Sequence, residues 1–383
     1  MNKLLKSSLA ALLALSLVAC SGGNGGASNG NGGNESAGSS DVKVAMVTDY
    51  GDITDQSFNQ TTYEAAKAWS DANKVEFTYK KPASDSDADR VSSIEEAIEE
   101  GYNVIVMPGY AFANAIYEVA GTYPDTKFVA LDVSEGDLTA YGEREFSADN
   151  VYSAVYQEEL AGYMAGYAAV KLGYKKLGFL GGMAVPAVVR YGFGFVQGAE
   201  AAAKEAGIDG VEIKYAYGNQ FFGDADITAA MDTWYSGGTE VVFACGGGIF
   251  TSAAEAAAKV GGKVIGVDVD QAATIDGGYG EGMTVTSAMK GLAPTVNTLL
   301  TAIAGGEWDK YKGQIQTLGL VSEDPSLNYV QLPTTTQWAD GFTEDDYKAL
   351  VGELYKGSRK VDNGTETMPK TEAVKVEDLG NIK

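Results

Sequence analysis

The stretch VKVAMVTDYGDITDQSFNQTTYEAAKAWSDA (42–72) decides the fold class. Its first seven residues are rich in valine and lack strict alternation, which indicates a strand covered on both faces of a parallel sheet. A helix is predicted over 56–72, with Asp55 or Ser57 as its N-cap and Phe58 on its inner face. A strand that leads into a covering helix is the repeating unit of α/β folds.

The strand–helix unit recurs along the chain, in two series about 130 residues apart, which predicts two similar doubly wound lobes. Each lobe is expected to carry a parallel sheet with right-handed crossovers. The first series of strands is predicted at 42–48, 75–81, 104–108, 127–131 and, more weakly, 139–147. The second is predicted at 176–182, 211–217, 240–247, 263–270 and 283–288. Helices are predicted at 56–72, 94–101, 113–122, 151–172, 195–206, 226–236, 249–260, 292–304 and 343–355.

Three crossings between the lobes are predicted, near 146–150, 286–290 and 312–320. They divide the chain into an N-terminal lobe of 41–148 plus 287–315 and a C-terminal lobe of 149–286 plus 316–383. The polar tail beyond the last helix is expected to be loosely held. The cleft between two such lobes is the expected binding site.

The first forty residues predict export and attachment to a membrane. Residues 1–19 read as a signal peptide, with Lys3 and Lys6 before a short apolar run. The sequence LVAC (17–20) resembles a bacterial lipobox, which makes Cys20 the expected lipidated residue. Residues 21–40 contain eight Gly, five Ser and four Asn, so 20–40 reads as a flexible tether. A glycine-rich tether suggests a Gram-positive host. The body is therefore expected on the outer face of the cytoplasmic membrane.

Charge and composition exclude several classes of function. The net charge of −24 argues against nucleic acid or an anionic lipid surface as a partner. The chain has no histidine, which removes catalysis by Ser-His-Asp or Cys-His and the commonest zinc ligand. Only Cys245 accompanies Cys20, and it lies in an apolar run that reads as a buried strand, so a packed thiol is expected. No cofactor, no metal site and no enzymatic activity are predicted.

Acidic, glycine and aromatic residues recur where the predicted strands end. The segments concerned are TDYGDITDQSFNQ (48–60), MPGYAFANA (107–115), LDVSEG (131–136), YGNQFFGDAD (217–226), CGGGIF (245–250) and GVDVDQ (266–271). Carboxylates accept paired hydrogen bonds from sugar hydroxyls, aromatic faces stack on flat rings, and glycines allow close backbone approach. The pattern favours a neutral ligand with a sugar end and a planar heteroaromatic end.

Two further motifs are not taken as sites. GFGFVQG (192–198) has glycines at the wrong spacing for a dinucleotide fingerprint. The acidic residues of 85–96 imitate a calcium loop, but Arg90 stands where that loop requires glycine.

At these residues the chain resembles the basic membrane protein (Bmp) family, the PnrA-like nucleoside-binding lipoproteins of ABC transporters. The resemblance covers nearly all of 42–332 and is strongest in TDYGDITDQSFNQ, in 107–132, in 158–198, and in VIGVDVDQ (264–271) with TSAMK (286–290). It implies the type I periplasmic-binding-protein fold, an α/β architecture of two doubly wound parallel-sheet lobes joined by a three-strand hinge.

The resemblance also implies ligand-binding residues. Asp49 and Asn59 would bond the ligand and Phe58 would stack on its base. Asp132 matches an acidic residue after the fourth strand, and Asp268 would hold ribose hydroxyls from the other lobe.

The remaining residues implied by the resemblance lie in the second half of the chain. Lys290 would bond the ligand or orient a carboxylate, although without the motif it reads as a surface lysine. The loop of the second stacking aromatic is longer here, so both Phe221 and Phe222 are candidates, with Gly247 on the adjoining glycine loop.

The function predicted is a lipid-anchored substrate-binding protein that captures a nucleoside, with purine nucleosides favoured, and delivers it to an ABC permease. Closure of the lobes around the ligand would be the mechanism. A receptor for a free sugar or a flavin-like heterocycle and a non-transport surface lipoprotein remain alternatives. The sequence does not choose among individual nucleosides.

Overall fold

The computed structural model describes residues 41–140 and 145–382, which belong to one compact unit. The predicted signal peptide, the lipidated Cys20 and the tether lie outside the described residues. Within the described part, no helix is both long and apolar enough to cross a membrane.

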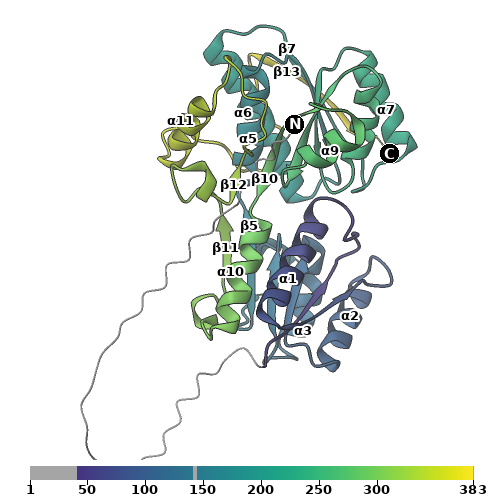
Figure 1. The fold of residues 1–383 in the computed structure, drawn as a ribbon, viewed down its shortest axis with the longest axis vertical. Helices are drawn as coiled ribbons and strands as arrows, with labels where there is room; N and C mark the ends of the chain where they lie inside the picture. The colour runs from purple at the N-terminus through teal and green to yellow at the C-terminus, as the bar shows by residue number, and fades with distance from the viewer. Residues whose placement is uncertain (1–40, 141–144, 383) are drawn as a thin grey trace, which may run out of the picture. The chain divides into compact units, whose positions relative to one another are not determined.

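The first sheet contains six parallel strands in the order β11-β5-β4-β3-β1-β2 (Figure 1). Its strands are β1 (Lys43–Val47), β2 (Glu76–Lys80), β3 (Val104–Pro108), β4 (Lys127–Leu131), β5 (Val151–Tyr156) and β11 (Ile315–Leu318). Helices α1 (Phe58–Asn73) and α10 (Leu292–Ala304) pack together, as do α2 (Asp87–Glu99) and α3 (Ala113–Ala120). Short helices α4 (Glu135–Ala140), η1 (Tyr110–Phe112) and η2 (Trp308–Lys310) complete this lobe.

The second sheet contains seven strands in the order β12-β10-β9-β8-β6-β7-β13. Its strands are β6 (Lys176–Gly181), β7 (Val211–Tyr217), β8 (Val241–Cys245), β9 (Lys263–Asp268), β10 (Thr284–Lys290), β12 (Val330–Gln331) and β13 (Val374–Asn381). All pairings are parallel except that of β10 with β12. Helices α5 (Glu158–Lys171) and α6 (Pro186–Ala206) pack together, and so do α7 (Ala225–Ser236) and α8 (Phe250–Ala258). The lobe also contains α9 (Ala272–Tyr279), η3 (Pro325–Leu327) and α11 (Glu344–Tyr355).

Fully buried valine, isoleucine and alanine side chains occupy the central strands of both sheets, as their unalternated sequences require. Separate clusters lie under α2 and α3 in the first lobe and under α7 and α8 in the second. A third and larger cluster includes residues of both sheets and of α1, α5, α6 and α10. Parallel strands all end at one edge of a sheet, so the loops that follow these strands lie together at that edge.

The chain passes between the sheets at three points in the described residues, but not all lie where the sequence placed them. The prediction of one helix over 151–172 is wrong, because 151–156 forms β5 of the first sheet and the helix begins at Glu158. The first crossing therefore lies at Gln157 rather than near 146–150. The others are at Gly291, after β10, and across 319–329.

The weak strand expected at 139–147 is also wrong where the structure describes it. Residues 139–140 end α4, residues 145–147 have no regular structure, and 141–144 lie outside the described residues.

Helices α5 and α6 pack closely because glycines on each helix lie against the backbone of the other helix. A Cβ added at Gly162 or Gly166 would lie about 2 Å from the carbonyl oxygens of Tyr191 or Phe195 on α6. A Cβ at Gly194 would lie 2.1 Å from the carbonyl oxygen of Glu159 on α5. Gly194 and Gly198 of GFGFVQG thus serve helix packing, whereas Gly192 gives room to the side chains of Tyr215 and Phe179.

The polar tail adds an edge strand, so the expectation of a loosely held tail is wrong. Strand β13 pairs in parallel with β7. Glu200 on α6 accepts hydrogen bonds from the backbone N–H groups of Glu372, Ala373 and Val374 at 2.8–3.1 Å. These bonds hold the segment that leads into the strand.

Candidate functional site

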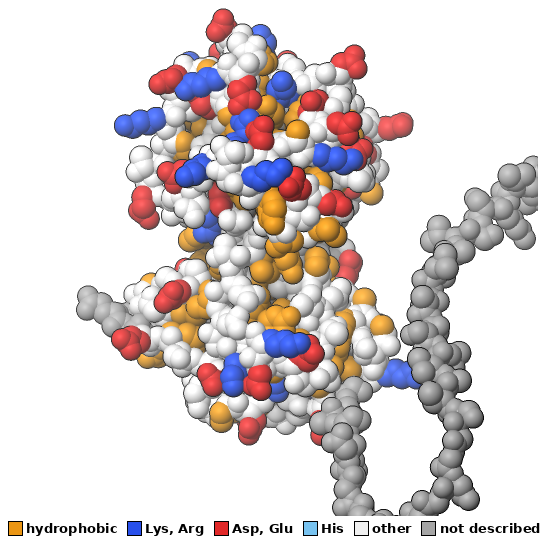
Figure 2. Space-filling view, turned by 90° about the vertical axis from the view of Figure 1, so that its left-hand side faces the viewer, with side chains coloured by type: hydrophobic (Ala, Val, Ile, Leu, Met, Phe, Trp, Pro, Cys, Tyr) orange, Lys and Arg blue, Asp and Glu red, His pale blue; other side chains and the backbone are white. Residues whose placement is uncertain are grey.

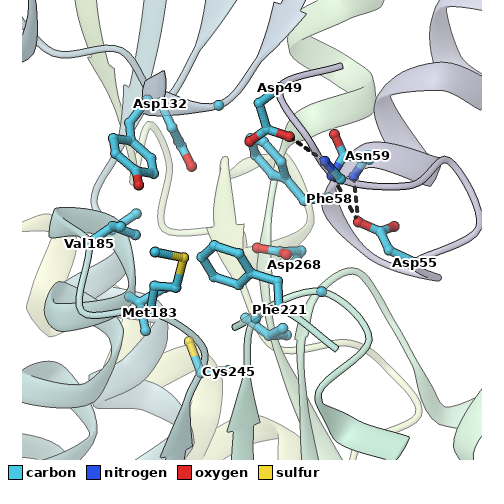
Figure 3. Close-up of a pocket in the computed structure, with 18 of the residues that line it drawn as sticks. Asp49, Asp55, Phe58, Asn59, Asp132, Met183, Val185, Phe221, Cys245 and Asp268 are labelled. Atoms are coloured by element: carbon cyan, nitrogen blue, oxygen red, sulfur yellow. Dashed lines mark hydrogen bonds between the residues drawn. The ribbon is translucent and has the colours of Figure 1, made fainter. Parts of the chain in front are cut away.

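A cavity of about 760 Å³ lies at the carboxyl ends of the strands and is lined by both lobes (Figure 3). Every pocket residue predicted from the sequence lines it, namely Asp49, Phe58, Asn59, Asp132, Phe221, Phe222, Gly247, Asp268 and Lys290. The structure therefore brings these side chains to one place. Contact with a ligand stays a prediction for each of them.

Asp49 lines the cavity directly after Thr48, which follows β1, and is 7 % exposed. Its Oδ1 atom accepts hydrogen bonds from the N–H groups of Tyr50 at 2.6 Å and Gly51 at 2.8 Å. Burial raises the pKa of this carboxyl, while the two N–H donors act against that shift. A side chain held in this way is a fixed hydrogen-bonding group facing the cavity.

Asn59 is on the first turn of α1, and its side chain lies beside that of Asp49 (Figure 3). Its backbone N–H and its side-chain Nδ2 both donate to Asp55 Oδ2, at 2.9 and 3.2 Å. The Oδ1 atom of Asn59 is buried and has no hydrogen-bond partner in the structure. Because an unpaired buried acceptor is costly, this atom is available for a donor on a ligand.

Aromatic rings from both lobes flank the cavity. Phe58 comes from α1, and Phe221 stacks at 6.4 Å between ring centroids on Tyr50 of the opposite lobe. Phe222 is 61 % exposed, so Phe221 is the inner ring of the two candidates. At Gly247, with φ of 51°, an added Cβ would lie 2.7 Å from the Phe221 carbonyl oxygen. Gly247 thus gives the Phe221 backbone the room it needs.

Lys290 lines the same cavity and is buried among carboxylates from both lobes. Its Nζ lies 2.5 Å from Asp132 Oδ2, 3.5 Å from Glu158 Oε1 and 3.8 Å from Asp268 Oδ1. Burial alone would lower the lysine pKa, but the attraction of these carboxylates outweighs it and raises the pKa. The ammonium also lies 4.6 Å from the centroid of the Phe58 ring. The interpretation of Lys290 as a surface lysine is therefore wrong.

Asp132 and Asp268 occupy equivalent places in the two lobes, directly after β4 and at the end of β9. Both have left-handed backbone conformations, with φ of 62° and 65°. Such conformations are costly for residues other than glycine and cluster at functional sites. Asp132 Oδ1 is buried without a hydrogen-bond partner, like the Asn59 acceptor. Asn59 and Asp132, which both line the cavity, thus each have one buried acceptor without a partner.

Sequence reasoning missed Glu158 and Arg190 as parts of this site. Glu158 is fully buried at the start of α5, and Arg190 Nε on α6 donates to its Oε2 atom at 2.7 Å. Burial raises the pKa of Glu158, whereas Arg190 and Lys290 act in the opposite direction. The sequence signal was a pair of acidic residues directly after a strand, and the assignment of 151–156 to a helix hid it.

Tyr50 and Met183 were also missed. The Tyr50 hydroxyl donates to the Met183 sulfur at 3.3 Å, from the first lobe to the second. Cys245 lines the cavity but is 1 % exposed, and burial raises its pKa well above the usual range, which agrees with a packed thiol. Among the described residues, no group of His, Cys, Asp and Glu side chains is arranged to hold a metal ion.

Comparison with solved structures supports the fold. The solute-binding protein of an ABC transporter system from Aeropyrum pernix K1 superposes with a TM-score of 0.64 at 22% identity, over 82% of this chain and 86% of that one. At this identity the likeness shows the fold alone. The chain has the type I periplasmic solute-binding fold predicted from its sequence.

Comparison with known sequences extends the likeness to a family. The ABC transporter nucleoside-binding protein BmpA of Lactococcus lactis subsp. cremoris is 33% identical over 248 residues, which is 60% of this chain and 65% of that relative, slightly less than two thirds. The CD4+ T-cell-stimulating antigen of Listeria innocua is 31% identical over 362 residues, or 88% of this chain and 97% of that relative. A family model described as ABC transporter substrate-binding protein PnrA-like matches residues 42–330. The chain therefore belongs to the PnrA-like (Bmp) family of ABC transporter substrate-binding proteins.

Proposed function

We propose that this protein is an extracytoplasmic, lipid-anchored receptor that captures a purine nucleoside between its lobes and delivers it to an ABC permease. The observation that carries the proposal is one cavity that combines two kinds of group. Aromatic rings and the buried amide of Asn59 line it together with carboxylates and a lysine. A nucleoside needs both kinds of partner, because a flat heteroaromatic base is joined to a hydroxyl-bearing sugar.

The carboxylates and Lys290 suit the ribose. Asp268 presents a carboxylate from the second lobe, and Asp132 presents a free Oδ1 acceptor from the first. Vicinal hydroxyls donate well to carboxylates, since hydrogen bonds to charged acceptors are the stronger kind. Lys290 Nζ, which has three donors, can donate to a sugar oxygen as well as to Asp132.

The aromatic rings suit the base. Phe58 and Phe221 offer ring faces, and stacking on a flat heterocycle needs no particular base. Asn59 offers both an unpartnered Oδ1 acceptor and a fixed position on α1. An acceptor and a carboxylate side by side favour a base that presents N–H groups on one edge, as purines such as guanine do.

The charges of the cavity favour an uncharged ligand. Seven aspartates line it, Asp49, Asp52, Asp55, Asp85, Asp132, Asp137 and Asp268, against the bases Lys81, Arg190 and Lys290. Both Arg190 and Lys290 are already paired with buried carboxylates. A 5′-phosphate would add like charge without a free partner, so nucleotides are expected to bind poorly.

Anchoring and delivery follow from the family and from the N-terminal sequence. Several relatives bear the name lipoprotein or basic membrane protein, and LVAC at 17–20 fits lipidation at Cys20. The scattered acidic and basic side chains on the face drawn in Figure 2 form no single charged patch there. The lipid is thus the proposed means of membrane attachment, on a Gram-positive cell. A Cys20→Ser variant is expected in the culture medium rather than in the membrane fraction.

The test of the binding function is a ligand panel scored by thermal stability and calorimetry. The panel contains purine and pyrimidine nucleosides, ribose, free bases, nucleoside monophosphates and riboflavin. A ligand at about a thousand times its Kd stabilises the native state by about 4 kcal/mol, which shifts Tm by several degrees. Purine nucleosides are expected to give the shift, and ribose, bases and nucleotides are not.

The other outcomes identify other functions. A larger shift with riboflavin or ribose would replace the nucleoside by that ligand class. No shift with any compound, after removal of any copurified ligand by unfolding and refolding, would favour a surface lipoprotein without transport. Release of free base from inosine would show an enzyme.

A further inference from the structure

Ser57 occupies the position before α1 where a serine ordinarily caps a helix, but its side chain does something else. Its hydroxyl makes no capping hydrogen bond. The Oγ atom lies 2.6 Å from Oδ2 of Asp268, to which it donates, and the side chain is fully buried. The two residues belong to different lobes, so this bond crosses the cleft.

Asp55 performs the capping that frees the serine. Its carboxylate accepts hydrogen bonds from the backbone N–H groups of Ser57, Asn59 and Gln60 at 2.9–3.0 Å. The backbone N–H groups at the start of α1 thereby have a hydrogen-bond acceptor without the serine hydroxyl. The hydroxyl is left to act on another residue.

The acceptor of this bond needs an orienting partner. Asp268 is 5 % exposed and has a left-handed backbone, and its second oxygen lies 3.8 Å from Lys290 Nζ. At 3.8 Å the lysine attracts the carboxylate without fixing its rotation. The hydrogen bond from Ser57 fixes the rotation of the carboxylate. A neighbouring hydrogen bond from Gln271 Nε2 to the Gln56 carbonyl oxygen, at 3.0 Å, joins the same two segments.

We propose that Ser57 is a positioning residue that orients the Asp268 carboxylate for the hydroxyl groups of the ligand. Since donor and acceptor lie on different lobes, the orientation exists only while the lobes are together. The serine thus links the strength of ligand binding to closure without touching the ligand. This inference rests on the proposed function, in which Asp268 binds the sugar.

The test compares Ser57→Ala with Thr62→Val in the purified full chain. Both variants delete a fully buried hydroxyl at α1, but that of Thr62 returns to the carbonyl oxygen of Phe58 in the same helix. Affinity and dissociation rate are measured with guanosine and with 2′,3′-dideoxyguanosine. For guanosine, Ser57→Ala is expected to raise Kd about tenfold or more, mostly through faster dissociation, because a bond to a charged acceptor is lost.

The dideoxy compound separates positioning from a merely structural role. It has no ring hydroxyls for Asp268 to hold, so Ser57→Ala is expected to leave its Kd nearly unchanged. Thr62→Val is expected to leave both ligands nearly unchanged. Ser57→Thr, which keeps a hydroxyl, is expected to recover most of the affinity for guanosine.

Each contrary outcome has its own meaning. If the unaltered chain binds guanosine and Ser57→Ala binds it equally well, the positioning role is wrong and the nucleoside function stands. Equal losses for both ligands would also overturn the positioning role, since they would indicate a general loosening of the site. If the unaltered chain binds no nucleoside, the proposed function fails and this inference fails with it.

Discussion

Lys290 Nζ lies 2.5 Å from Oδ2 of Asp132, and this ion pair joins the end of β10 in one sheet to the residue after β4 in the other. The same ammonium lies within 4 Å of carboxylate oxygens of Glu158 and Asp268. The carboxyl groups of Asp132, Glu158 and Asp268 and the cations Lys290 and Arg190 form a network at two of the crossings between the lobes. The crossings and the cavity therefore share charged residues.

Lys290→Met is expected to lower the free energy of unfolding by about 3–5 kcal/mol, because it leaves buried carboxylates without their counter-charge. Urea denaturation at pH 7 measures the loss. Lys67→Met is the matched control, since it removes an exposed lysine that pairs with Asp71 within one helix and is expected to leave the free energy of unfolding nearly unchanged. Equal losses in the two variants would contradict a network centred on Lys290.

Phe221→Ala is expected to weaken nucleoside binding about tenfold or more, whereas Phe222→Ala is expected to change it less than about threefold. Phe221 is the inner ring that stacks on Tyr50, and Phe222 is mostly exposed. Calorimetric titration of both variants with the same nucleoside measures the difference. A larger loss from Phe222→Ala would reverse the assignment of the stacking ring.

The Glu159→Gln substitution is expected to raise the free energy of unfolding, and to raise it by a larger amount at higher pH. Burial raises the pKa of Glu159 to about 7, and the charge of Glu158 acts in the same direction. A raised carboxyl pKa means that the folded state binds more protons, so this group destabilises the fold progressively as pH rises from about 4.5 to about 7.

The neutral glutamine avoids that loss, and a gain of about 2–3 kcal/mol is expected at pH 8, with a much smaller gain at pH 5. Denaturation curves at both pH values measure it. The exposed Glu118→Gln is the control. A gain independent of pH would show that ionisation of Glu159 is not its cause.

Gly194→Ala is expected to destabilise the fold by roughly 2–3 kcal/mol or more, because its Cβ would meet backbone atoms of α5 that cannot move aside separately. Gly277→Ala on α9 is the control, since a Cβ there meets nothing within 4 Å and alanine favours the helix. Thermal unfolding of both variants measures the difference. Equal stability would mean that α5 and α6 can separate without cost.

Most of the architecture could be predicted because its strands are unalternated valine-rich runs and its helices lie between them. The strand β5 was mistaken because VYSAVY leads directly into a long helix-forming stretch, and one-dimensional patterns do not mark where a strand becomes a helix. Strand β13 was missed for another reason. Only Val374 of its residues is buried, so its pairing depends on β7 and Glu200 rather than on its own sequence.

The pocket residues could be predicted because the ends of parallel strands meet at one edge, and the resemblance to the family selected among them. What the sequence could not provide was pairwise geometry. Ser57 reads as a helix cap, and only the fold shows that its hydroxyl points to Asp268. The order of Phe221 and Phe222 likewise depends on the direction in which one loop turns.

Strand β13 has a consequence for how the molecule is made. The edge of β7 is covered only after residues 374–381 have been synthesised, and every other strand of that sheet is synthesised earlier. An uncovered strand edge invites pairing between chains, so a molecule truncated before Val374 is exposed to aggregation even though its ligand cavity is intact.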